Sequence, residues 1–272
     1  MNSTSSEPFD LVLIGGGNMG EALLGGLLGG GAHHADDVAV VEIDPGRRTT
    51  LSAAYPGVTV LEQCPPCRAA VVAVKPLDAG AAAATAATAG ATRVLSIAAG
   101  VTTTALESAI GEVGGGVRVA VVRAMPNTPA LVGSGASAIS GGRAAEADDL
   151  AWAASILGAV GIVEELPEPH LDAFTATVGS GPAYVFLVAE ALIEAAVAEG
   201  LDPEVASRSV VQLLVGSSAL LAAEGDPSEL RRKVTSPGGT TEAGLGELDR
   251  ANLRASFATA VRAAAQRSRE LG

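Results

Sequence analysis

The fold is decided by a stretch near the start of the chain, Leu11-Val12-Leu13-Ile14-Gly15-Gly16-Gly17-Asn18-Met19-Gly20. Its first four residues are apolar, which predicts a short buried strand, and a helical segment follows from about residue 21 to residue 28. Between them, the first glycine of a Gly-x-Gly-x-x-Gly pattern permits a tight turn. The second lets a pyrophosphate approach the backbone, and the third lets helix and strand pack closely. The stretch predicts a dinucleotide-binding loop; the alternative is a glycine-rich turn without a ligand.

Further apolar runs follow, with helical segments between several of them. Each run is continuous rather than alternating, which indicates strands covered on both faces and therefore a parallel sheet. Strands alternate with helices over about 160 residues, which predicts a doubly wound α/β domain. The expected strands are Leu11–Ile14, Val38–Val41, Ala70–Val74, Val94–Ile97 and Val117–Val122.

The pattern changes after residue 164, where β-rich runs end and helical periodicity begins. Asp202-Pro203 and Asp226-Pro227 each provide an N-cap followed by a proline at the first helical position. We therefore predict a dinucleotide-binding domain over residues 1–164 and an all-helical domain over residues 165–272. One helix face is formed by Tyr184, Leu187, Val188, Ala191, Leu192 and Ala195.

Composition limits the partners. The formal charge of −13 argues against nucleic acid and anionic membrane, since both require a basic surface. The first ten residues lack the basic flank and apolar core of a signal peptide. The apolar run Ala183–Ala198 contains Glu190 and Glu194, and Val210–Ala223 is too short to span a bilayer. We expect a soluble, cytoplasmic protein with no membrane partner.

The cysteines form a Cys64-Pro65-Pro66-Cys67 motif. Zinc would need two more ligands nearby, and the histidines are distant in sequence. A redox role would need an exposed thiol at a helix start. We expect no metal site and two ordinary loop thiols. The remaining candidates, expected as surface or loop residues, are His33, His34 and His170.

Residues after the second expected strand bear on nucleotide preference. An acid here accepts the ribose hydroxyls of NAD, whereas an arginine pairs with the extra phosphate of NADP. The chain offers both, as Glu42 or Asp44 against Arg47 or Arg48. The preference stays open.

A second anion site is indicated by Val234-Thr235-Ser236-Pro237-Gly238-Gly239-Thr240-Thr241-Glu242, a turn followed by helical sequence. Unpaired backbone N–H groups at such a helix start suit a small carboxylate. One site for a dinucleotide and another for a small acid indicate an oxidoreductase.

The usual acids of carbonyl reduction are missing. Neither Tyr55 nor Tyr184 has a lysine four residues later, and the only lysines are Lys75 and Lys233. A carbonyl reduction needs an acid beside the oxygen. A cyclic imine does not require a strong acid, because its basic nitrogen can arrive protonated. The pattern favours C=N over C=O reduction.

Together these motifs resemble the Δ1-pyrroline-5-carboxylate reductase family, whose members catalyse the last step of proline synthesis. The resemblance implies an N-terminal Rossmann domain and a C-terminal helical domain that dimerises by interlocking helices, with decamers in many members. It runs nearly end to end and is carried by Ile14–Gly20, Val72–Pro76, Arg123–Pro129, Val178–Tyr184 and Val234–Thr241.

For the cofactor, the resemblance implies NADP(H) or NAD(H), with the pyrophosphate on the glycine loop. Asp44 occupies a place where NADP-preferring members often carry serine, which leaves strict NADP preference in doubt. The implied cofactor residues are Ile14, Gly15, Gly17, Asn18, Met19, Gly20, Asp44, Ala73, Val74, Lys75, Pro76, Met125, Pro126 and Asn127.

For the substrate, the resemblance implies a cleft at the dimer interface. The catalytic residue is Thr241, whose hydroxyl bonds the ring nitrogen, and Glu224 is an acidic residue near the substrate. The segment 178–181, which includes Ser180, closes the pocket. The substrate carboxylate is assigned to Ser236, Gly238, Gly239 and Thr240.

Some of these residues also have structural interpretations. Lys75-Pro76 could terminate a strand, Ser180 could enter a helix, and Met125 could fill the core. Thr240 and Thr241 could be N-caps, which is compatible with binding. Arg123 could be a salt-bridge partner. Two rival functions also remain: a β-hydroxyacid dehydrogenase of the same architecture, which needs a lysine on a second-domain helix, and a non-catalytic dinucleotide sensor.

Overall fold

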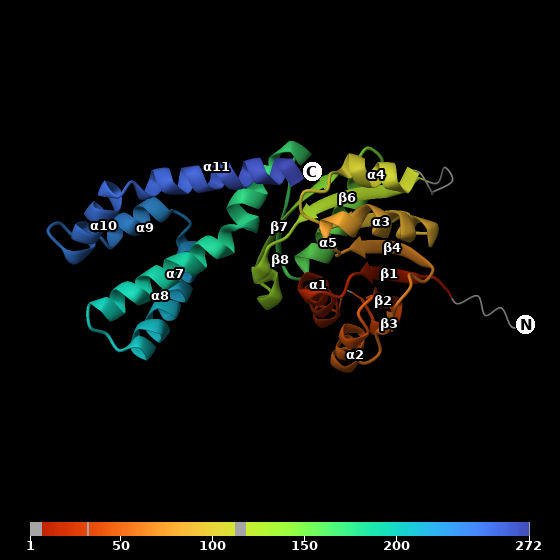
Figure 1. Ribbon diagram of the computed structural model, residues 1–272, viewed down its shortest axis with the longest axis horizontal. Coiled ribbons are helices and arrows are strands. Elements are labelled where there is room, and N and C mark those ends of the chain that lie inside the picture. The colour runs from red at the N-terminus through yellow and green to blue at the C-terminus, as the bar shows by residue number, and fades with distance from the viewer. Residues whose placement is uncertain (1–6, 32, 112–117, 272) are drawn as a thin grey trace, which may run out of the picture. The chain divides into compact units, whose positions relative to one another are not determined.

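The computed structural model describes residues 7–31, 33–111 and 118–271, and contains an eight-stranded sheet in the order β3-β2-β1-β4-β5-β6-β7-β8 (Figure 1). Strands β1 to β6 are parallel, in the order of a doubly wound dinucleotide fold. Strand β7 runs antiparallel to β6, and β8 runs parallel to β7. The strands are β1 (Phe9–Ile14), β2 (Val38–Val41), β3 (Thr59–Leu61), β4 (Cys67–Val72), β5 (Arg93–Ser96), β6 (Ala120–Met125), β7 (Gly135–Gly141) and β8 (Gly161–Glu165).

The predicted α/β class and the parallel order are confirmed, but the strand list was incomplete. Strand β6 continues to Met125, past the expected end at Val122, and Val117 lies outside the described residues. Strand β3 has only three half-buried residues, and β7 consists mainly of small residues, so neither has a continuous run of large apolar side chains.

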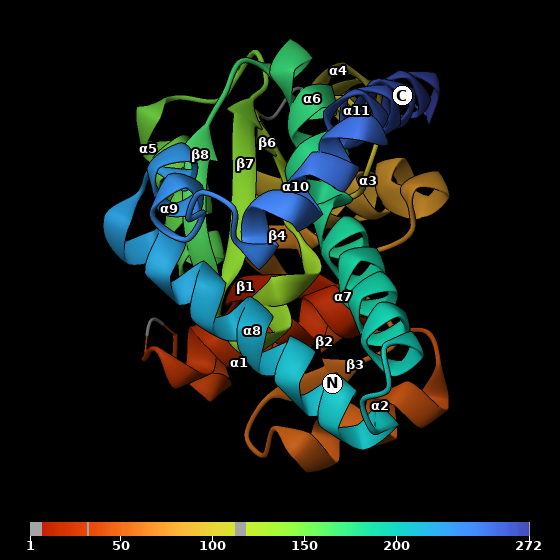
Figure 2. The same cartoon turned by 90° about the vertical axis from the view of Figure 1, so that its left-hand side faces the viewer.

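Helices cover both faces of the sheet. On β1, Leu11 and Leu13 join a core cluster with α1 and α5, while Val12 and Ile14 join another with α3 and α4. Figure 2 shows α5 on one side of the sheet and α3 and α4 on the other. The helices are α1 (Asn18–Gly29), α2 (Pro45–Ala54), α3 (Ala79–Thr88), α4 (Thr103–Gly111), α5 (Ala147–Gly158), α6 (Leu171–Phe174), α7 (Gly181–Ala198), α8 (Pro203–Glu224), α9 (Pro227–Lys233), α10 (Thr240–Arg250) and α11 (Leu253–Leu271).

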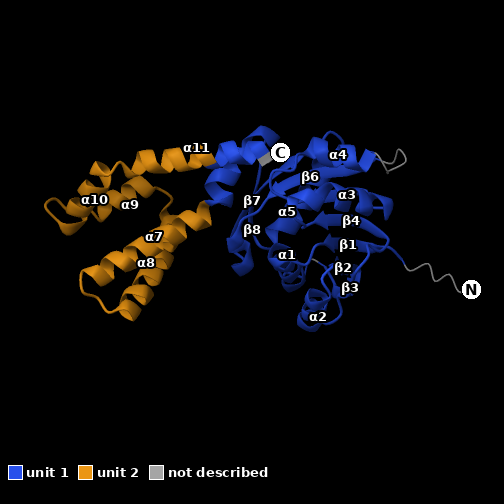
Figure 3. Cartoon of the chain, viewed as in Figure 1, with its two compact units in different colours: residues 1–180, 264–272 blue, residues 181–263 orange. Residues whose placement is uncertain are grey.

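The chain forms two compact units (Figure 3). The first runs to residue 180 and includes the C-terminal residues from 264; the second comprises residues 181–263. The predicted division at residue 165 assigns 165–180 to the helical domain. In the structure these residues belong to the first unit, where Leu171 and Ala176 are both 0% exposed.

The second unit is all-helical, as expected. Asp202 accepts hydrogen bonds from the N–H groups of Glu204 and Val205 at the start of α8, and Asp226 caps α9 in the same way. Both predicted N-caps are therefore confirmed. Helices α7 and α8 pack together yet leave large apolar side chains exposed, among them Val185, Phe186, Leu187, Val211, Leu213 and Val215.

Two helical segments, Glu168–Ala198 and Pro203–Glu224, are long and apolar enough to cross a membrane by length and composition alone. This differs from the sequence expectation, because the helices extend beyond the apolar runs in the sequence. It is weak evidence for a span, since core helices of soluble proteins pass the same test. The exposed apolar side chains of α7 and α8 form a surface of the kind that binds a partner.

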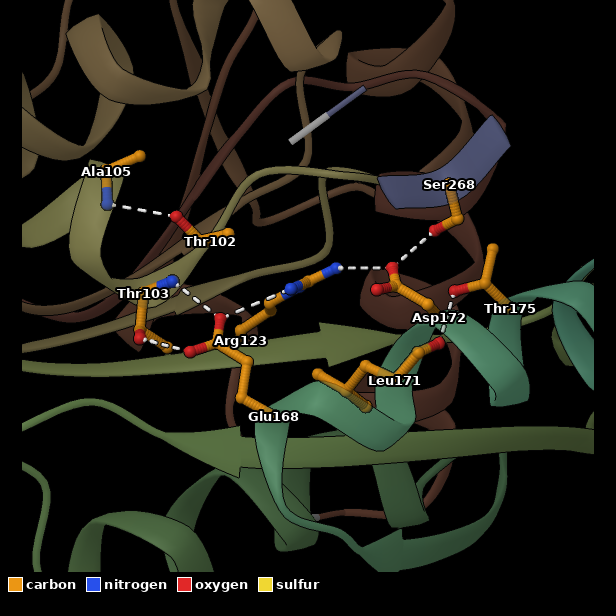
Figure 4. A network of polar contacts seen from close by, with 9 residues as sticks. All are labelled: Thr102, Thr103, Ala105, Arg123, Glu168, Leu171, Asp172, Thr175 and Ser268. Carbon is orange, nitrogen blue, oxygen red and sulfur yellow. Dashed lines mark hydrogen bonds and ion pairs between the residues drawn. The ribbon is translucent and has the colours of Figure 1, made fainter. Parts of the chain in front are cut away.

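A polar network, here called the Arg123 clamp, ties distant parts of the first unit together (Figure 4). The buried Arg123 of β6 donates to Glu168 Oε1 at 3.2 Å and lies 3.9 Å from Asp172 Oδ1. Glu168 also accepts from the N–H and hydroxyl of Thr103, at the start of α4. The Ser268 hydroxyl donates to Asp172 Oδ1 at 2.7 Å. The clamp therefore fixes the chain where it approaches residue 180 and where it returns in α11.

The hydrogen bonds and the positive charge in the Arg123 clamp favour the ionised form of Glu168. Burial raises the pKa of Glu168, but hydrogen bonds from Thr103 and the bond and charge of Arg123 outweigh it, so the pKa lies below its ordinary value of 4.5. A carboxyl group whose pKa falls on folding stabilises the fold as the carboxylate. That contribution is complete above about pH 4.5 and is lost as the pH falls through the lowered pKa.

Glu168→Gln should lower the free energy of unfolding by about 1–3 kcal/mol at neutral pH, because it weakens the bonds to Arg123 and Thr103. The difference from the unmodified protein should shrink below about pH 4.5, where Glu168 itself becomes protonated. Urea unfolding across pH measures both effects. Glu164→Gln, at an exposed carboxylate of β8, is the matched control. A difference that stays constant into acid would contradict the assigned role.

Candidate functional site

The glycine loop has the geometry of an anion cradle. Gly15 has φ +107°, and a Cβ on it would lie 2.5 Å from Ala73 O, so only glycine fits. A Cβ on Gly20 would lie 2.2 Å from Gly15 O, which explains the close packing of α1 on β1. A Cβ on Gly17 would meet nothing within 4 Å. Gly17 is thus the open position, at the start of a helix without a side-chain cap, where backbone N–H groups suit a phosphate.

Charged side chains after β2 are bonded within the protein. Glu42 accepts from Gly16 N–H at 2.9 Å and from Asp44 N–H at 2.9 Å. The Asp44 carboxylate caps α2 by accepting from Arg47 N–H at 2.6 Å. Arg47 donates to Gly16 O and to Glu21. Arg48 donates to the backbone oxygens of Glu42 and Ile43. Acids and arginines both line this corner, so the geometry leaves the nucleotide preference open.

The predicted residues Ala73 to Pro76, which follow β4, lie at the same edge of the sheet as the glycine loop. Ala73 N–H donates to Ile14 O at 2.8 Å, which joins the end of β4 to the end of β1. Ile14 itself is buried, whereas Lys75 and Pro76 are exposed. Strand β4 ends at Val72, so Lys75 and Pro76 do not terminate it; Lys75 instead caps the short 3-10 helix Pro76–Asp78. A role at this edge in binding is compatible with that geometry.

Met125, the last residue of β6, and Asn127, which follows the strand, contact the segment that precedes residue 181. Asn127 Nδ2 donates to Val178 O at 3.2 Å, and its Oδ1 accepts from Ala136 N–H at 2.9 Å. A Cβ on Gly179 would lie 2.7 Å from Met125 Cε, so the glycine permits this contact. Both ends of the Asn127 amide are therefore used inside the protein, and Asn127 positions Val178 and its neighbours.

The segment so held is a π-helical turn, Thr175–Gly179. Ser180 N–H donates to Thr175 O at 2.8 Å, which closes the wide turn. Such turns are rare and often occur at functional sites. Ser180 is half-buried and lies in the first unit, next to the residues that Asn127 and Met125 hold. Sequence patterns gave no sign of this turn.

Two exposed apolar residues were also missed. Ile43 after β2 is 81% exposed, and Leu77 after β4 is 98% exposed. Ile43 lies two residues after β2, and Leu77 lies in the 3-10 helix Pro76–Asp78, five residues after β4. The signal available in the sequence was a single apolar residue a few positions after each strand. The edge as a whole, with its open glycine and flanking apolar groups, fits a nicotinamide dinucleotide.

The residues predicted to bind the substrate carboxylate lie in the second unit. Gly238 has φ +70°, and its N–H donates to Glu242 Oε2 at 2.7 Å. Gly239 N–H donates to Ser236 O at 3.0 Å. Gly239 is the N-cap of α10, and no side chain caps it. Among the described residues, no hydrogen-bond acceptor is seen for the N–H groups of Thr240 and Thr241 in the first turn, where a small anion fits.

Glu224 has a partner of its own. Its Oε2 lies 2.6 Å from Lys233 Nζ, so the last residue of α8 is paired with the last residue of α9. Both side chains are exposed. The pair presents a balanced charge at the end of the two helices.

The comparisons with known proteins cover the whole chain. The profile described as pyrroline-5-carboxylate reductase dimerisation matches residues 168–271, and the profile described as NADP oxidoreductase coenzyme F420-dependent matches residues 10–100. The pyrroline-5-carboxylate reductase of Mycobacterium leprae is 40% identical over 96% of both chains. That of Synechocystis is 40% identical over 96% of this chain and 98% of its own.

Solved structures agree. The chain is similar to a pyrroline-5-carboxylate reductase from Coxiella burnetii, with a TM-score of 0.87 and 33% identity over 98% of this chain and 99% of that one. It is also similar to the Plasmodium falciparum pyrroline carboxylate reductase with NADP bound, with a TM-score of 0.83 and 28% identity over 98% of this chain and 100% of that one. The chain belongs to the pyrroline-5-carboxylate reductase family.

Proposed function

We propose that the chain catalyses the NAD(P)H-dependent reduction of 1-pyrroline-5-carboxylate to L-proline, the last step of proline biosynthesis. The single observation that carries this proposal is the end-to-end match at 40% identity to relatives with that activity. The geometry supports it with two uncapped helix N-termini, one at the glycine loop and one at α10.

The first unit holds the cofactor in this proposal. The N–H groups around Gly17 bind the pyrophosphate, and the residues from Ala73 to Pro76 lie beside the ribose and nicotinamide. Met125 and Pro126 border the nicotinamide, while Asn127 keeps Val178 in place. The bound reduced nicotinamide supplies the hydride. The protein's main contribution is to hold the nicotinamide and the substrate at van der Waals distance, which can lower the reaction barrier by ~7–11 kcal/mol in favourable cases.

The second unit holds the substrate carboxylate at the start of α10. Of the three amides assigned to it, only that of Thr240 is without an acceptor among the described residues. Gly238 N–H donates to the exposed Glu242 carboxylate. A substrate carboxylate would replace this carboxylate, because the two groups are chemically alike. Ser236 shapes the turn through its backbone oxygen, and Glu224 lies at the end of α8 as a more remote contributor.

Thr241 is the proposed catalytic residue. Its hydroxyl is exposed in the first turn of α10, where it can hydrogen-bond the ring nitrogen. That bond orients the C=N group and keeps the proton on the nitrogen. A basic imine nitrogen arrives protonated, so no stronger acid is required. Ser180, at the end of the π-turn, closes the pocket in this proposal.

A second copy of the chain is the proposed cover for the apolar surface of α7 and α8. The dimerisation profile spans these helices, and the exposed residues form an extensive apolar surface. Glu190 and Glu194 make a bilayer a poor alternative, since a charge in hydrocarbon is costly. We propose a cytoplasmic homodimer, with further assembly to a homodecamer left to measurement.

The rival oxidoreductase is less well supported. A β-hydroxyacid dehydrogenase needs a lysine on a second-domain helix. The structure places Lys233 at the end of α9 in the second unit, which the sequence pattern did not predict, and pairs it with Glu224. Lys75 lies in the first unit. A non-catalytic sensor would have no use for the uncapped start of α10.

The proposal predicts turnover. Purified protein should oxidise NADPH or NADH when pyrroline-5-carboxylate is added, with L-proline as the product identified by chromatography. The two nucleotides assayed in parallel give the preference that Asp44 and Arg47 leave open. Oxidation of a 3-hydroxy acid without imine reduction would instead favour the rival enzyme, and tight nucleotide binding without any turnover would favour the sensor.

Thr241→Ala should lower kcat by about 10–100-fold, because one orienting hydrogen bond in the transition state is lost. The nucleotide dissociation constant should be unchanged, since Thr241 lies in the other unit. Steady-state kinetics and nucleotide titration measure the two effects. Thr241→Ser, which keeps the hydroxyl, is the matched control and should retain most of the activity. Equal losses of turnover and nucleotide binding would reject the role.

The two glycines of the loop should separate folding from binding. Gly17→Ala places a methyl group in open space, so the melting temperature should hold while nucleotide affinity falls about tenfold or more. Gly20→Ala forces a methyl group against Gly15 O and should lower the melting temperature as well. Thermal melts and nucleotide titration of both variants test this contrast. If Gly17→Ala binds nucleotide normally, the pyrophosphate does not lie on this loop.

A further inference from the structure

The two cysteines lie together at the edge of the sheet away from the glycine loop. Cys67 begins β4 opposite Phe9 of β1, whereas the far ends of these strands carry the cofactor loop. Both thiols are free; Cys64 is half-buried and Cys67 is buried. The proposed reaction uses neither of them, so the pair is left unexplained.

The loop between the cysteines is stiff and anchored. Pro65 and Pro66 each have a fixed φ and no N–H group, which limits how the loop can move. Pro66 O accepts from Phe9 N–H at 3.0 Å, and Cys67 N–H donates to Ala89 O at 3.1 Å. The loop is therefore tied on one side to β1 and on the other to the end of α3. The backbone at Pro66 and Cys67 is therefore held on both sides.

The two thiols are not equivalent. Cys64 is half-buried and its Sγ donates to Pro65 O at 3.6 Å, whereas Cys67 is 2% exposed. The neighbouring Cys67 thiol lowers the pKa of Cys64, although burial opposes it, and the neighbouring Cys64 thiol together with burial raises the pKa of Cys67. Cys64 is thus the more accessible thiol and the one that ionises first. This asymmetry is that of an attacking and a resolving cysteine.

A cavity gives access to Cys64. It has a volume of about 440 Å³ and is lined by Cys64, Pro66, Ala84, Thr85, Thr88 and Ala89. Its walls are small and uncharged, and Cys64 is the one reactive group among them. Metal binding is not indicated, since the described residues contain no cluster of three or more His, Cys, Asp or Glu side chains.

We propose that Cys64 and Cys67 form a thiol–disulfide exchange site that accepts a low-molecular-weight disulfide through this cavity. The Cys64 thiolate attacks one sulfur of the incoming disulfide, forms a mixed disulfide and releases the first thiolate, which takes up a proton. Cys67 then loses its proton, attacks the Cys64 sulfur and releases the second thiolate. The protein dithiol is oxidised by two electrons to a Cys64–Cys67 disulfide, and the incoming disulfide is reduced to two thiols.

Glutathione disulfide, added to the reduced full-length protein, is the probe. Intact mass should fall by two hydrogens, after a transient glutathione adduct, and peptide mapping should place the new bond between Cys64 and Cys67. Cys67→Ser should accumulate a stable glutathione adduct on Cys64. Cys64→Ser should react at least about tenfold more slowly, because the remaining thiol is buried and poorly ionised.

Cys67→Ala is a second variant without the resolving cysteine, for use if a serine at this buried position prevents folding. A thermal melt of each variant checks that it is folded. Native protein whose mass stays unchanged, while the urea-unfolded chain reacts, would overturn the proposal. So would a native adduct that never resolves, or equal reaction rates in Cys64→Ser and the unmodified protein.

Discussion

The rest of the structure depends on neutralising one buried guanidinium. Arg123 is 5% exposed, and a buried charge is tolerated only with close partners. Its partners are Glu168 and Asp172, from the segment that leads out of the first unit, and Asp172 in turn binds Ser268, where α11 returns. The charge on β6 therefore sets the path of both chain segments. Removing one partner leaves the buried charge less well compensated, which destabilises the fold.

That constraint extends into the cofactor edge. Met125 ends the strand that carries Arg123, and Asn127 follows it. Met125 packs against Gly179 while Asn127 binds Val178, so β6 supports the π-turn by side-chain contacts as well as through the clamp. The Thr175–Gly179 turn is an uncommon conformation, and such conformations persist where surrounding contacts determine them. The position of Ser180 therefore depends on the ion pair between Arg123 and Glu168.

Local patterns predicted what local interactions decide. The glycine loop, the large apolar strands and the caps Asp202 and Asp226 depend on neighbours within a few residues. The Asn127–Val178 bond joins residues 51 apart, and the Glu42–Gly16 bond joins residues 26 apart. No rule of sequence spacing predicts such long-range pairs. The same holds for the contact of β7 with β6, because Ala136, Ser137 and Ala138 lack the large side chains that mark a strand. The candidate site residues came from local patterns and from the family resemblance, and their roles stay predictions, whereas the internal hydrogen bonds of their amides could not be predicted.

Those internal bonds explain how a chain of net charge −13 can bind anions. In each unit a glutamate of the protein already occupies a backbone N–H of the candidate anion site: Glu42 on Gly16 and Glu242 on Gly238. Glu42 is half-buried and accepts a second bond from Asp44 N–H, so it is a permanent part of the loop and leaves the open Gly17 side to a phosphate. Glu242 is exposed and holds its partner by one bond. In the proposed function, a substrate carboxylate that reaches Gly238 would take the place of the Glu242 carboxylate, because both groups can accept the same hydrogen bond.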